Sequence, residues 1–417
     1  MSETIAIEDL RVGMFIHLEG GWMSHPFALS SFRIESEHDL ARLRSLGVPR
    51  LRWSPDKSEL GGAAAAPAPE PEPPTGATDH DAAAARHAAL LAAQRTALRR
   101  CEQQFDEASS ALKGAVAAVR DRPQQARETV QALSQALLSK LVPDTEICVR
   151  VLGEQAGEKP TTHALNVTVI SMLMGRVFGF SDAEMAELAT GALLHDIGKL
   201  DQPHRLHHHE ERFTQAELNG YRDHVRLGVA HGKRMGLSAT ALQVIEQHHE
   251  CADGTGFPAR LNVDRMSTPA RIVSLVNRYD NLCNPRTAAR GLTPHEALSR
   301  LFAQGKGKFD ATMLNSFIRM MGVYPAGSVV QLTDDRYAVV THVNTTRPLK
   351  PRVLIHDPKV PAEQALLVNL AESQHLGIRR SLPSPQLSEE AREYLRPAAR
   401  VAYFFEAAPP PTEPTWL

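Results

Sequence analysis

Hydrophobic and polar residues alternate near both ends of the chain and recur with helical spacing between those ends. The alternating runs predict short strands, and their ranges are 4–7, 14–18 and 50–53 in the first region and 328–332, 337–340 and 352–355 in the second. Glu37–Leu43 predicts a short helix within the first region. We therefore expect a mostly α-helical chain with a small α+β N-terminal domain and a small C-terminal β extension.

The central helices are marked by apolar stripes and by the residues at their ends. Residues 82–119 have strong helical propensity, and a second helix follows Pro123 to about Leu141. An apolar helix begins near Thr161, and another spans residues 270–280. Serine or threonine followed three residues later by glutamate predicts further helix starts at Ser181, Thr214 and Thr293.

Composition divides the chain into five segments. Residues 61–81 are rich in alanine and proline and are expected to form a disordered linker, because they cannot bury enough surface to order themselves. The expected segments are an N-terminal input or docking domain (1–60), this linker (61–81), a helical segment (82–143), a histidine-rich domain (144–345) and a C-terminal extension with a disordered tail (346–417). The first segment is equally well explained as a structural cap. The helical segment offers a surface for a homodimer.

Charge and cysteine content limit the class of protein. The 417 residues are 42% hydrophobic and 23% charged with a net charge of −2, which is ordinary for a soluble globular protein and gives no sign of binding to a nucleic-acid polymer. The N-terminus is polar and acidic, and no apolar run approaches the ~20 residues of a membrane span. The four cysteines lack CxxC spacing and are typical of free thiols. We expect a cytoplasmic protein without a membrane partner.

Histidine is the unusual component. The chain has 19 histidines, and many fall between His163 and His249. His195 and Asp196 stand together at the polar end of an apolar helix, and neutral imidazole and carboxylate are both good ligands for a divalent metal. Taken alone, the pair is better explained by a hydrogen bond inside a helical core, because short motifs often match by chance.

The remaining histidines favour a metal site. His163, His224 and the adjacent His248 and His249 each lie on or beside a different predicted helix. Five imidazoles and one carboxylate exceed the four ligands of a single zinc ion, so they suit two metal ions that share a bridging oxygen. A ligand set without thiolate favours iron or manganese, with zinc and nickel as alternatives.

Together these motifs resemble the HD-GYP domain, a branch of the HD metal-dependent phosphohydrolases that act as cyclic di-GMP phosphodiesterases. The matching stretches are His163, His195–Lys199, His224–Gly228, His248–Pro258, Phe309-Asp310 and Gly322–Gly327. The resemblance covers roughly residues 145–345, and the combination of motifs makes it specific. Residues 1–60 also resemble an uncharacterised N-terminal domain that is often found ahead of such catalytic domains.

Three positions depart from the family pattern. Phe257 stands at the signature tyrosine, so the ring is kept and a hydroxyl is lost. Lys159 stands where members with three metals carry a glutamate, so the resemblance implies a binuclear site. Asn277 replaces a ligand aspartate, and its amide oxygen can coordinate but brings no charge, so the metals are expected to bind more weakly.

The resemblance also implies a role for each site residue. A hydroxide that bridges two divalent metals attacks phosphorus, with Lys199 and Asp196 as the catalytic residues and Lys199 neutralising charge on the phosphoryl oxygens. The implied metal ligands are His163, His195, Asp196, His224, His248, His249 and Asn277. Arg286 and Arg290 stand where the family binds substrate, although each is equally well explained as a surface arginine. Glu250 and Asp253 are expected to orient the histidines and the loop that follows them.

Three functions are compatible with this pattern. The leading hypothesis is a signalling phosphodiesterase that hydrolyses cyclic di-GMP to the linear dinucleotide. The alternative is a degenerate, non-catalytic domain that binds cyclic di-GMP or a partner signalling protein, and it is motivated by Asn277 and Phe257. A third is an HD hydrolase acting on another nucleotide or phosphate ester, because the sequence does not define the pocket for the base.

Overall fold

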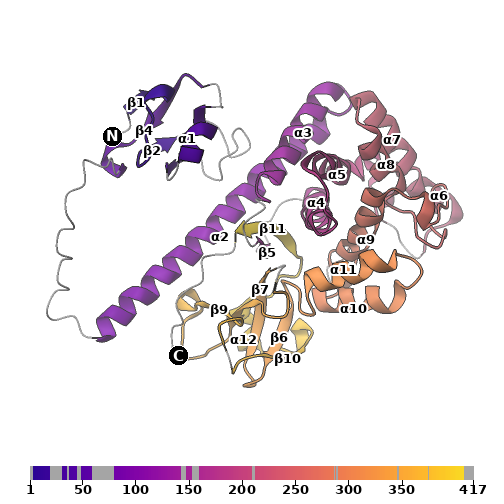
Figure 1. The fold of residues 1–417 in the computed structure, drawn as a ribbon. Coiled ribbons are helices and arrows are strands. Elements are labelled where there is room, and N and C mark those ends of the chain that lie inside the picture. The colour runs from indigo at the N-terminus through magenta and orange to yellow at the C-terminus, as the bar shows by residue number, and fades with distance from the viewer. Residues whose placement is uncertain are drawn as a thin grey trace. The chain divides into compact units, whose positions relative to one another are not determined.

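The computed structural model describes most of the chain. The described residues are 3–18, 31–34, 37–44, 48–58, 79–141, 147–152, 159–208, 212–285, 287, 290–344, 347–373 and 375–407. The chain divides into two compact units, Met1–Ala89 and Leu90–Leu417. Helices predominate and each unit contains a β-sheet, which confirms the predicted fold class (Figure 1).

The N-terminal unit is built on a four-stranded antiparallel sheet. Its strands run in the order β1-β4-β2-β3. The elements are β1 (Glu3–Ala6), η1 (Ile7–Asp9), β2 (Phe15–His17), β3 (Ser31–Arg33), α1 (Glu37–Arg44), β4 (Arg50–Trp53) and η3 (Pro55–Lys57). The predicted strands and helix are confirmed, whereas β3 was not predicted. Ile16, Ile34 and Leu43 are fully buried in the core of this unit.

Two long helices connect the sheet-forming N-terminus to the histidine-rich part. Helix α2 spans Asp79–Ala118 and α3 spans Pro123–Leu138. Helix α2 begins inside the predicted linker, and residues 61–78 of that linker lie outside the described residues. Pro123 occupies the first turn of α3, where its missing N–H has no helical partner to lose. The buried face of α3 packs on α5 (Asp182–Leu194).

The histidine-rich part is a group of packed helices. Besides α5, its elements are α4 (Lys159–Val177), η4 (Ile197–Asp201), η5 (His204–Leu206), α6 (Gln215–Arg222), α7 (His224–Met235), α8 (Ala239–Gln247), η6 (Val263–Arg265), α9 (Thr268–Cys283), α10 (Pro294–Gln304) and α11 (Ala311–Met321). Helix α4 packs on α5 and α9, and α5 packs on α8 (Figure 1). The capping boxes predicted at Ser181, Thr214 and Thr293 are all formed.

A seven-stranded antiparallel sheet completes this unit. Its elements are β5 (Ile147–Leu152), β6 (Val329–Leu332), β7 (Tyr337–Asn344), β8 (Arg352–Ile355), η8 (Ala362–Gln364), β9 (Leu367–Asn369), β10 (Ile378–Ser381), η9 (Ser384–Gln386), α12 (Glu389–Leu395) and β11 (Ala402–Ala407). The path is β10-β6-β7-β5-β11, with β8 joining β7 to β9. The three predicted strands are present, but β5 lies before the histidine helices and pairs with β11 near the C-terminus. The sheet therefore crosses the predicted division at residue 345. Ala407 belongs to β11 rather than to a tail, while residues 408–417 lie outside the described residues.

A buried charged triad links three of these strands. Arg150 on β5 donates to both carboxylate oxygens of Glu406 on β11 at 2.9 and 2.8 Å. His342 on β7 lies with its Nε2 2.5 Å from Oε2 of the same carboxylate. Burial opposes ionisation of Glu406, but the hydrogen bond from His342 and the charge of Arg150 prevail and lower its pKa to about 2.

Two further sequence predictions concern the whole chain. Among the described helices, none combines the length and the apolar character needed to cross a bilayer. None of the four cysteines forms a disulfide bond within the described structure.

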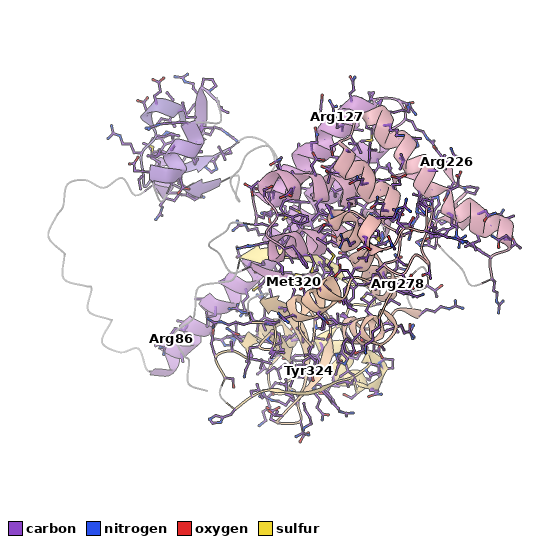
Figure 2. The ribbon with its side chains drawn as sticks, turned by 45° about the vertical axis from the view of Figure 1, so that its right-hand side comes forward. Arg86, Arg127, Arg226, Arg278, Met320 and Tyr324 are labelled. Carbon is purple, nitrogen blue, oxygen red and sulfur yellow. The ribbon has the colours of Figure 1, made fainter. Side chains whose placement is uncertain are left out.

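Met320, at the end of α11, and Tyr324 lie where the helices meet the C-terminal sheet (Figure 2).

Candidate metal centre

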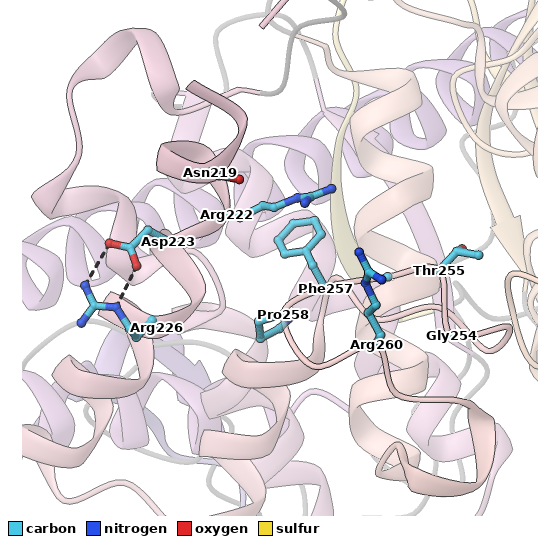
Figure 3. A pocket seen from close by; sticks show the side chains of 10 residues that line it. Asn219, Arg222, Asp223, Arg226, Gly254, Thr255, Phe257, Pro258 and Arg260 are labelled. Carbon is cyan, nitrogen blue, oxygen red and sulfur yellow. Dashed lines mark hydrogen bonds and ion pairs between the residues drawn. The ribbon is translucent and has the colours of Figure 1, made fainter. Parts of the chain in front are cut away.

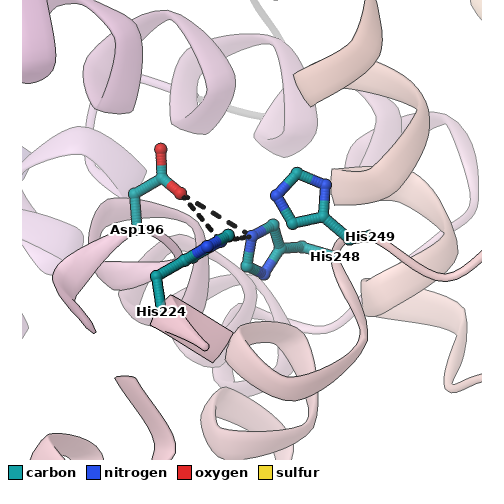
Figure 4. A group of neighbouring side chains, drawn as sticks. All are labelled: Asp196, His224, His248 and His249. Carbon is teal, nitrogen blue, oxygen red and sulfur yellow. Dashed lines mark hydrogen bonds and ion pairs between the residues drawn. The ribbon is translucent and has the colours of Figure 1, made fainter. Parts of the chain in front are cut away.

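Four segments of the helical part bring histidine and carboxylate side chains together. His163 lies in α4, His195 is the C-cap of α5 with Asp196 directly after it, His224 begins α7, and His248 and His249 follow α8. Their potential ligand atoms form two groups, each within 4.8 Å: Asp196, His224, His248 and His249 in one (Figure 4), and His163, His195 and Asp196 in the other. The two groups share Asp196. They contain every histidine and carboxylate ligand predicted from the sequence.

A glycine permits the close approach that this convergence requires. A Cβ atom at Gly198 would lie 1.9 Å from the carbonyl oxygen of His224 and 2.4 Å from the backbone nitrogen of Gly228. Both distances are far inside van der Waals contact, so only glycine lets η4 lie against α7 in this way. Gly198 thereby places Asp196, two residues earlier, beside His224.

Backbone carbonyls fix the tautomer of three of the histidines. Nδ1 of His195 lies 2.7 Å from the carbonyl oxygen of Ala192. Nδ1 of His224 lies 2.5 Å from that of Tyr221, and Nδ1 of His248 lies 2.8 Å from that of Ile245. A carbonyl oxygen only accepts hydrogen bonds, so each Nδ1 carries the proton. Each Nε2 is then an unprotonated lone-pair donor, the form that binds a metal.

These bare nitrogens face one another and a carboxylate oxygen. Nε2 of His224 lies 3.3 Å from Nε2 of His248, and Nε2 of His163 lies 3.2 Å from Nε2 of His195. Oδ1 of Asp196 is buried without a hydrogen-bond partner and lies 3.5 Å from Nε2 of His224. Lone pairs this close repel unless a cation lies between them. The residues therefore fit divalent metal ions.

Burial sets the protonation states that such binding needs. It lowers the pKa of His224 to about 3 despite the opposing charge of Asp196, and it lowers the pKa of His195 and His249. Burial alone would raise the pKa of Asp196, but the charge of Lys199 and the neighbouring His195 hold it well below its ordinary value. Neutral imidazoles around an ionised carboxylate are the state that accepts a metal without releasing protons.

Two neighbours hold the ligands in place. Nζ of Lys199 donates at 2.6 Å to Oδ2 of Asp196, the oxygen that lies 3.5 Å from Nε2 of His195, while Oδ1 faces His224. The hydroxyl group of Tyr221 lies 3.4 Å from Nε2 of His249, and burial raises the pKa of this phenol, so it stays neutral beside that ring. Tyr221 was missed in the sequence, although it lies three residues before His224 and its carbonyl also fixes that ring.

Asp280 is the outer partner of His163. Its carboxylate is fully buried on α9, and Oδ2 lies 2.6 Å from Nδ1 of His163. Because a carboxylate only accepts, it places the proton of His163 on Nδ1 and turns Nε2 toward the metal group. Asn277 is buried one turn earlier, and its Oδ1 accepts a hydrogen bond from Nδ2 of Asn281 at 2.6 Å. Its role as a ligand stays a prediction.

The loop after the paired histidines is organised by two acidic residues. Glu250 is fully buried, and its two oxygens accept hydrogen bonds from the backbone nitrogens of Ala259 at 2.7 Å and Leu261 at 2.9 Å. Asp253 accepts from the backbone and hydroxyl of Thr255 at 2.9 and 2.6 Å. Both residues therefore shape the loop, while their predicted effect on the histidines stays a prediction.

The predicted substrate arginines are not placed at the centre by any contact. Arg286 lies outside the described residues, and Arg290 is exposed in the turn after α9, where its backbone nitrogen bonds to the carbonyl oxygen of Thr287 at 2.9 Å. Lys159 begins α4, but its side chain lies outside the described part. The roles given to these residues stay predictions.

A pocket of about 640 Å³ adjoins the histidines (Figure 3). Phe257 forms part of its wall and stacks on His249, with ring centroids 4.5 Å apart and planes inclined by 22°. Its lining residues are Asn219, Arg222, Asp223, Arg226, Gly254, Thr255, Gly256, Phe257, Pro258 and Arg260. The pocket was not predicted from the sequence, because its residues come from two separate segments with no shared motif.

The fold and the site define a helical domain with histidine–aspartate groups that could bind metal. Residues 119–313 match the HD domain family, and residues 2–130 match a domain of unknown function, DUF3391. The chain therefore carries an HD domain preceded by a DUF3391 domain, and the resemblance predicted from the sequence is confirmed.

Several known proteins are similar to this chain. It is 29% identical to the cyclic di-GMP phosphodiesterase PA4108 of Pseudomonas aeruginosa, over 88% of this chain and 89% of that protein. It is 33% identical to the 3'3'-cGAMP-specific phosphodiesterase 3 of Vibrio cholerae, over 33% of this chain and 30% of that protein. Among solved structures, Bd1817, an HDG"Y"P protein from Bdellovibrio bacteriovorus, matches with a TM-score of 0.43 and 16% identity, over 76% of this chain and 98% of that one.

Proposed function

We propose that this protein is a cytoplasmic signalling phosphodiesterase that hydrolyses cyclic di-GMP to the linear dinucleotide. The observation that carries the proposal is the pair of ligand groups joined by Asp196, whose inward oxygen has no hydrogen-bond partner. A relative that aligns over most of the chain is named a cyclic di-GMP phosphodiesterase, which supports this substrate. A relative named for 3'3'-cGAMP makes that dinucleotide the first competitor to test.

The proposed cofactors are two divalent cations, iron or manganese, one in each ligand group. When bound, they would supply an activated water molecule and positive charge for the oxygens of the scissile phosphate. His224, His248 and His249 would hold one cation, His163 and His195 the other, and Asp196 would contact both. The absence of thiolate from both groups supports iron or manganese over zinc.

The remaining side chains would position these ligands and the substrate. Lys199 lies beside the shared carboxylate. Its positive charge would stabilise the negative charge that develops on the phosphoryl oxygens during hydrolysis. Tyr221 and Asp280 hold the rings of His249 and His163 in their orientations.

The test is turnover and metal content measured on one sample. Protein reconstituted with Fe(II) or Mn(II) should convert cyclic di-GMP to the linear dinucleotide, detected by mass spectrometry, and should hold about two metals per chain by elemental analysis. Asp196→Ala should lose metal and turnover together. His231→Ala, a histidine of α7 outside both groups, is the control. Wild-type protein that holds its metals but does not cleave the dinucleotide would refute the proposal.

A second candidate is a non-catalytic domain that binds cyclic di-GMP or a signalling protein. Asn277 favours it, because its amide oxygen is engaged by Asn281 and offers no charge to a cation. Asn277→Asp separates the two candidates. Under the non-catalytic hypothesis this variant gains turnover that the wild type lacks, whereas the phosphodiesterase hypothesis requires turnover in the wild type.

A further inference from the structure

The pocket in Figure 3 shares a wall with the metal centre. Phe257 stacks on His249 at 4.5 Å, and the guanidinium carbon of Arg222 lies 5.3 Å from the centre of the same ring. A metal-ligating histidine, an aromatic ring and a guanidinium group are thus in continuous contact. The ring of Phe257 therefore links the lining of the pocket to His249 of the candidate metal centre.

Two arginines of the pocket have no acidic partner among the described residues. Arg226 is held by Asp223 through bonds of 2.7 and 3.0 Å and points outward from α7. Arg222 and Arg260 are joined to no described carboxylate, and Nε of Arg222 is buried without a hydrogen-bond partner. Both arginines line the pocket, and Figure 3 shows the guanidinium group of Arg222 by the ring of Phe257. The pocket is therefore lined by two guanidinium groups that no described carboxylate neutralises.

Arg260 occupies a backbone position that favours glycine. Its φ is 55°, in the left-handed region, where a side chain on Cβ is disfavoured. An arginine retained at such a position suggests that its side chain has a function that offsets the backbone strain. The left-handed turn carries this side chain to the lining of the pocket.

We propose that Arg222 and Arg260 form a subsite for a guanine base of the substrate, an inference that rests on the proposed function. Guanine presents two acceptors, O6 and N7, which match the paired donors of one guanidinium group. Adenine has a donor at N6 where guanine has the acceptor O6. An arginine placed for guanine would therefore face a second donor and lose one of its two hydrogen bonds. Arg260 supplies the paired donors, and the planar guanidinium of Arg222 supplies a stacking surface for the base.

The size of the pocket agrees with a base rather than with a phosphate alone. Its volume of about 640 Å³ lies within the range of pockets that hold nucleotide-sized ligands. In the proposed function the metal centre binds the scissile phosphate. The adjoining pocket would then hold the nucleoside attached to that phosphate. Both cyclic di-GMP and 3'3'-cGAMP carry a guanine, whereas cyclic di-AMP does not.

The test compares cyclic di-GMP with cyclic di-AMP on Arg260 variants. Arg260→Gly removes the side chain at a backbone position that suits glycine, and Arg260→Lys keeps the charge but loses the paired donors. Both should lower kcat/KM for cyclic di-GMP by about 5- to 150-fold and change the value for cyclic di-AMP much less. Arg265→Ala, an exposed arginine outside the pocket lining, is the matched control. Metal content confirms an intact centre in every variant.

Two kinetic outcomes would overturn the subsite. Equal losses on the two dinucleotides, or full preference for cyclic di-GMP in Arg260→Lys, would assign Arg260 to general attraction of anions. A binding measurement separates this inference from the proposed function. Calorimetry with GMP and AMP on the wild type should show a preference for GMP that Arg260→Gly abolishes, even if neither protein turns over a dinucleotide. If the wild type showed no preference for GMP, the guanine subsite would be refuted, and the proposed phosphodiesterase function would still stand.

Discussion

Replacement of Asp280 by asparagine should weaken one of the two metal groups and spare the other. Oδ2 of Asp280 accepts from Nδ1 of His163 at 2.6 Å. Oδ1 accepts from Nδ2 of Asn166 at 2.7 Å and from Nδ2 of Asn284 at 2.9 Å. All three partners donate hydrogen bonds to the Asp280 carboxylate. In an asparagine at position 280 the NH₂ group would replace one of the two oxygens, so in either orientation it would face at least one donor.

The size of the effect follows from this geometry. Loss of the outer partner of a metal-ligating histidine weakens metal binding by about 10- to 100-fold, or about 1.4 to 2.8 kcal/mol. The buried donor left without an acceptor lowers folding stability by about 1 to 3 kcal/mol. His163 belongs only to the group with His195 and Asp196, so the other group should bind its metal as before.

The assay is metal occupancy measured over a range of free Mn(II) concentrations. The wild type should show two binding events, and Asp280→Asn should shift one of them by the predicted factor. Asp201→Asn is the matched control, because Asp201 makes a contact of similar length, 2.7 Å, with His231 outside both metal groups. Equal weakening of both events, or occupancy identical to the wild type, would refute the positioning role of Asp280.

Three other predictions follow from the same structure. Gly198→Ala should cost the centre its metal and lower Tm, because the new Cβ would lie 1.9 Å from the His224 carbonyl oxygen; full metal content in this variant would contradict the close approach. Glu406→Gln should lower stability at pH 7 by about 2 to 3 kcal/mol, because the folded pKa of about 2 lies below the ordinary 4.5. That stabilisation is present above pH 4.5 and is lost as the pH falls through the folded pKa of about 2, so the gap between the two proteins in urea unfolding should narrow steadily from pH 4.5 to pH 2. A constant gap would count against the triad. Chelation should remove about 2.7 kcal/mol of stability from protein held at a metal concentration of 100 Kd, and an unchanged Tm would mean that the folded chain binds no metal.

Local sequence patterns predicted most helices and several strands. The capping boxes at Ser181, Thr214 and Thr293 fix helix starts through hydrogen bonds within four residues, so the signal and the structure share one segment. The pairing of β5 with β11 has no such local signal. Leu152 lies opposite Ala402 in that pair, and nothing in either strand identifies its partner. The C-terminal sheet was therefore predicted only in part.

The same contrast applies to the site. The histidines and Asp196 stand in short motifs, and the structure brings them together. Backbone carbonyls, such as those of Ala192 and Ile245, hold the proton of each ring on Nδ1 and leave Nε2 free to bind a metal. The directions of these carbonyls depend on where each helix ends, which the sequence motifs do not specify. The pocket arginines come from α6, from α7 and from the loop after Glu250, and only the folded chain joins these segments.

A carboxylate at position 277, the predicted ligand position, would change the charge of the centre, and that charge would act on metal and substrate in opposite directions. The position is 3% exposed, so a carboxylate there would act through a medium of low dielectric constant. It would hold divalent cations more tightly and would also reduce the net positive charge that attracts an anionic phosphodiester. Asparagine should therefore weaken metal binding while favouring substrate binding once the metals are in place. Asn277→Asp should then raise metal affinity and raise KM at saturating metal. If the wild type stays inactive at saturating metal while the variant turns over, the missing carboxylate takes part in the chemistry itself, and the natural chain is a binding domain.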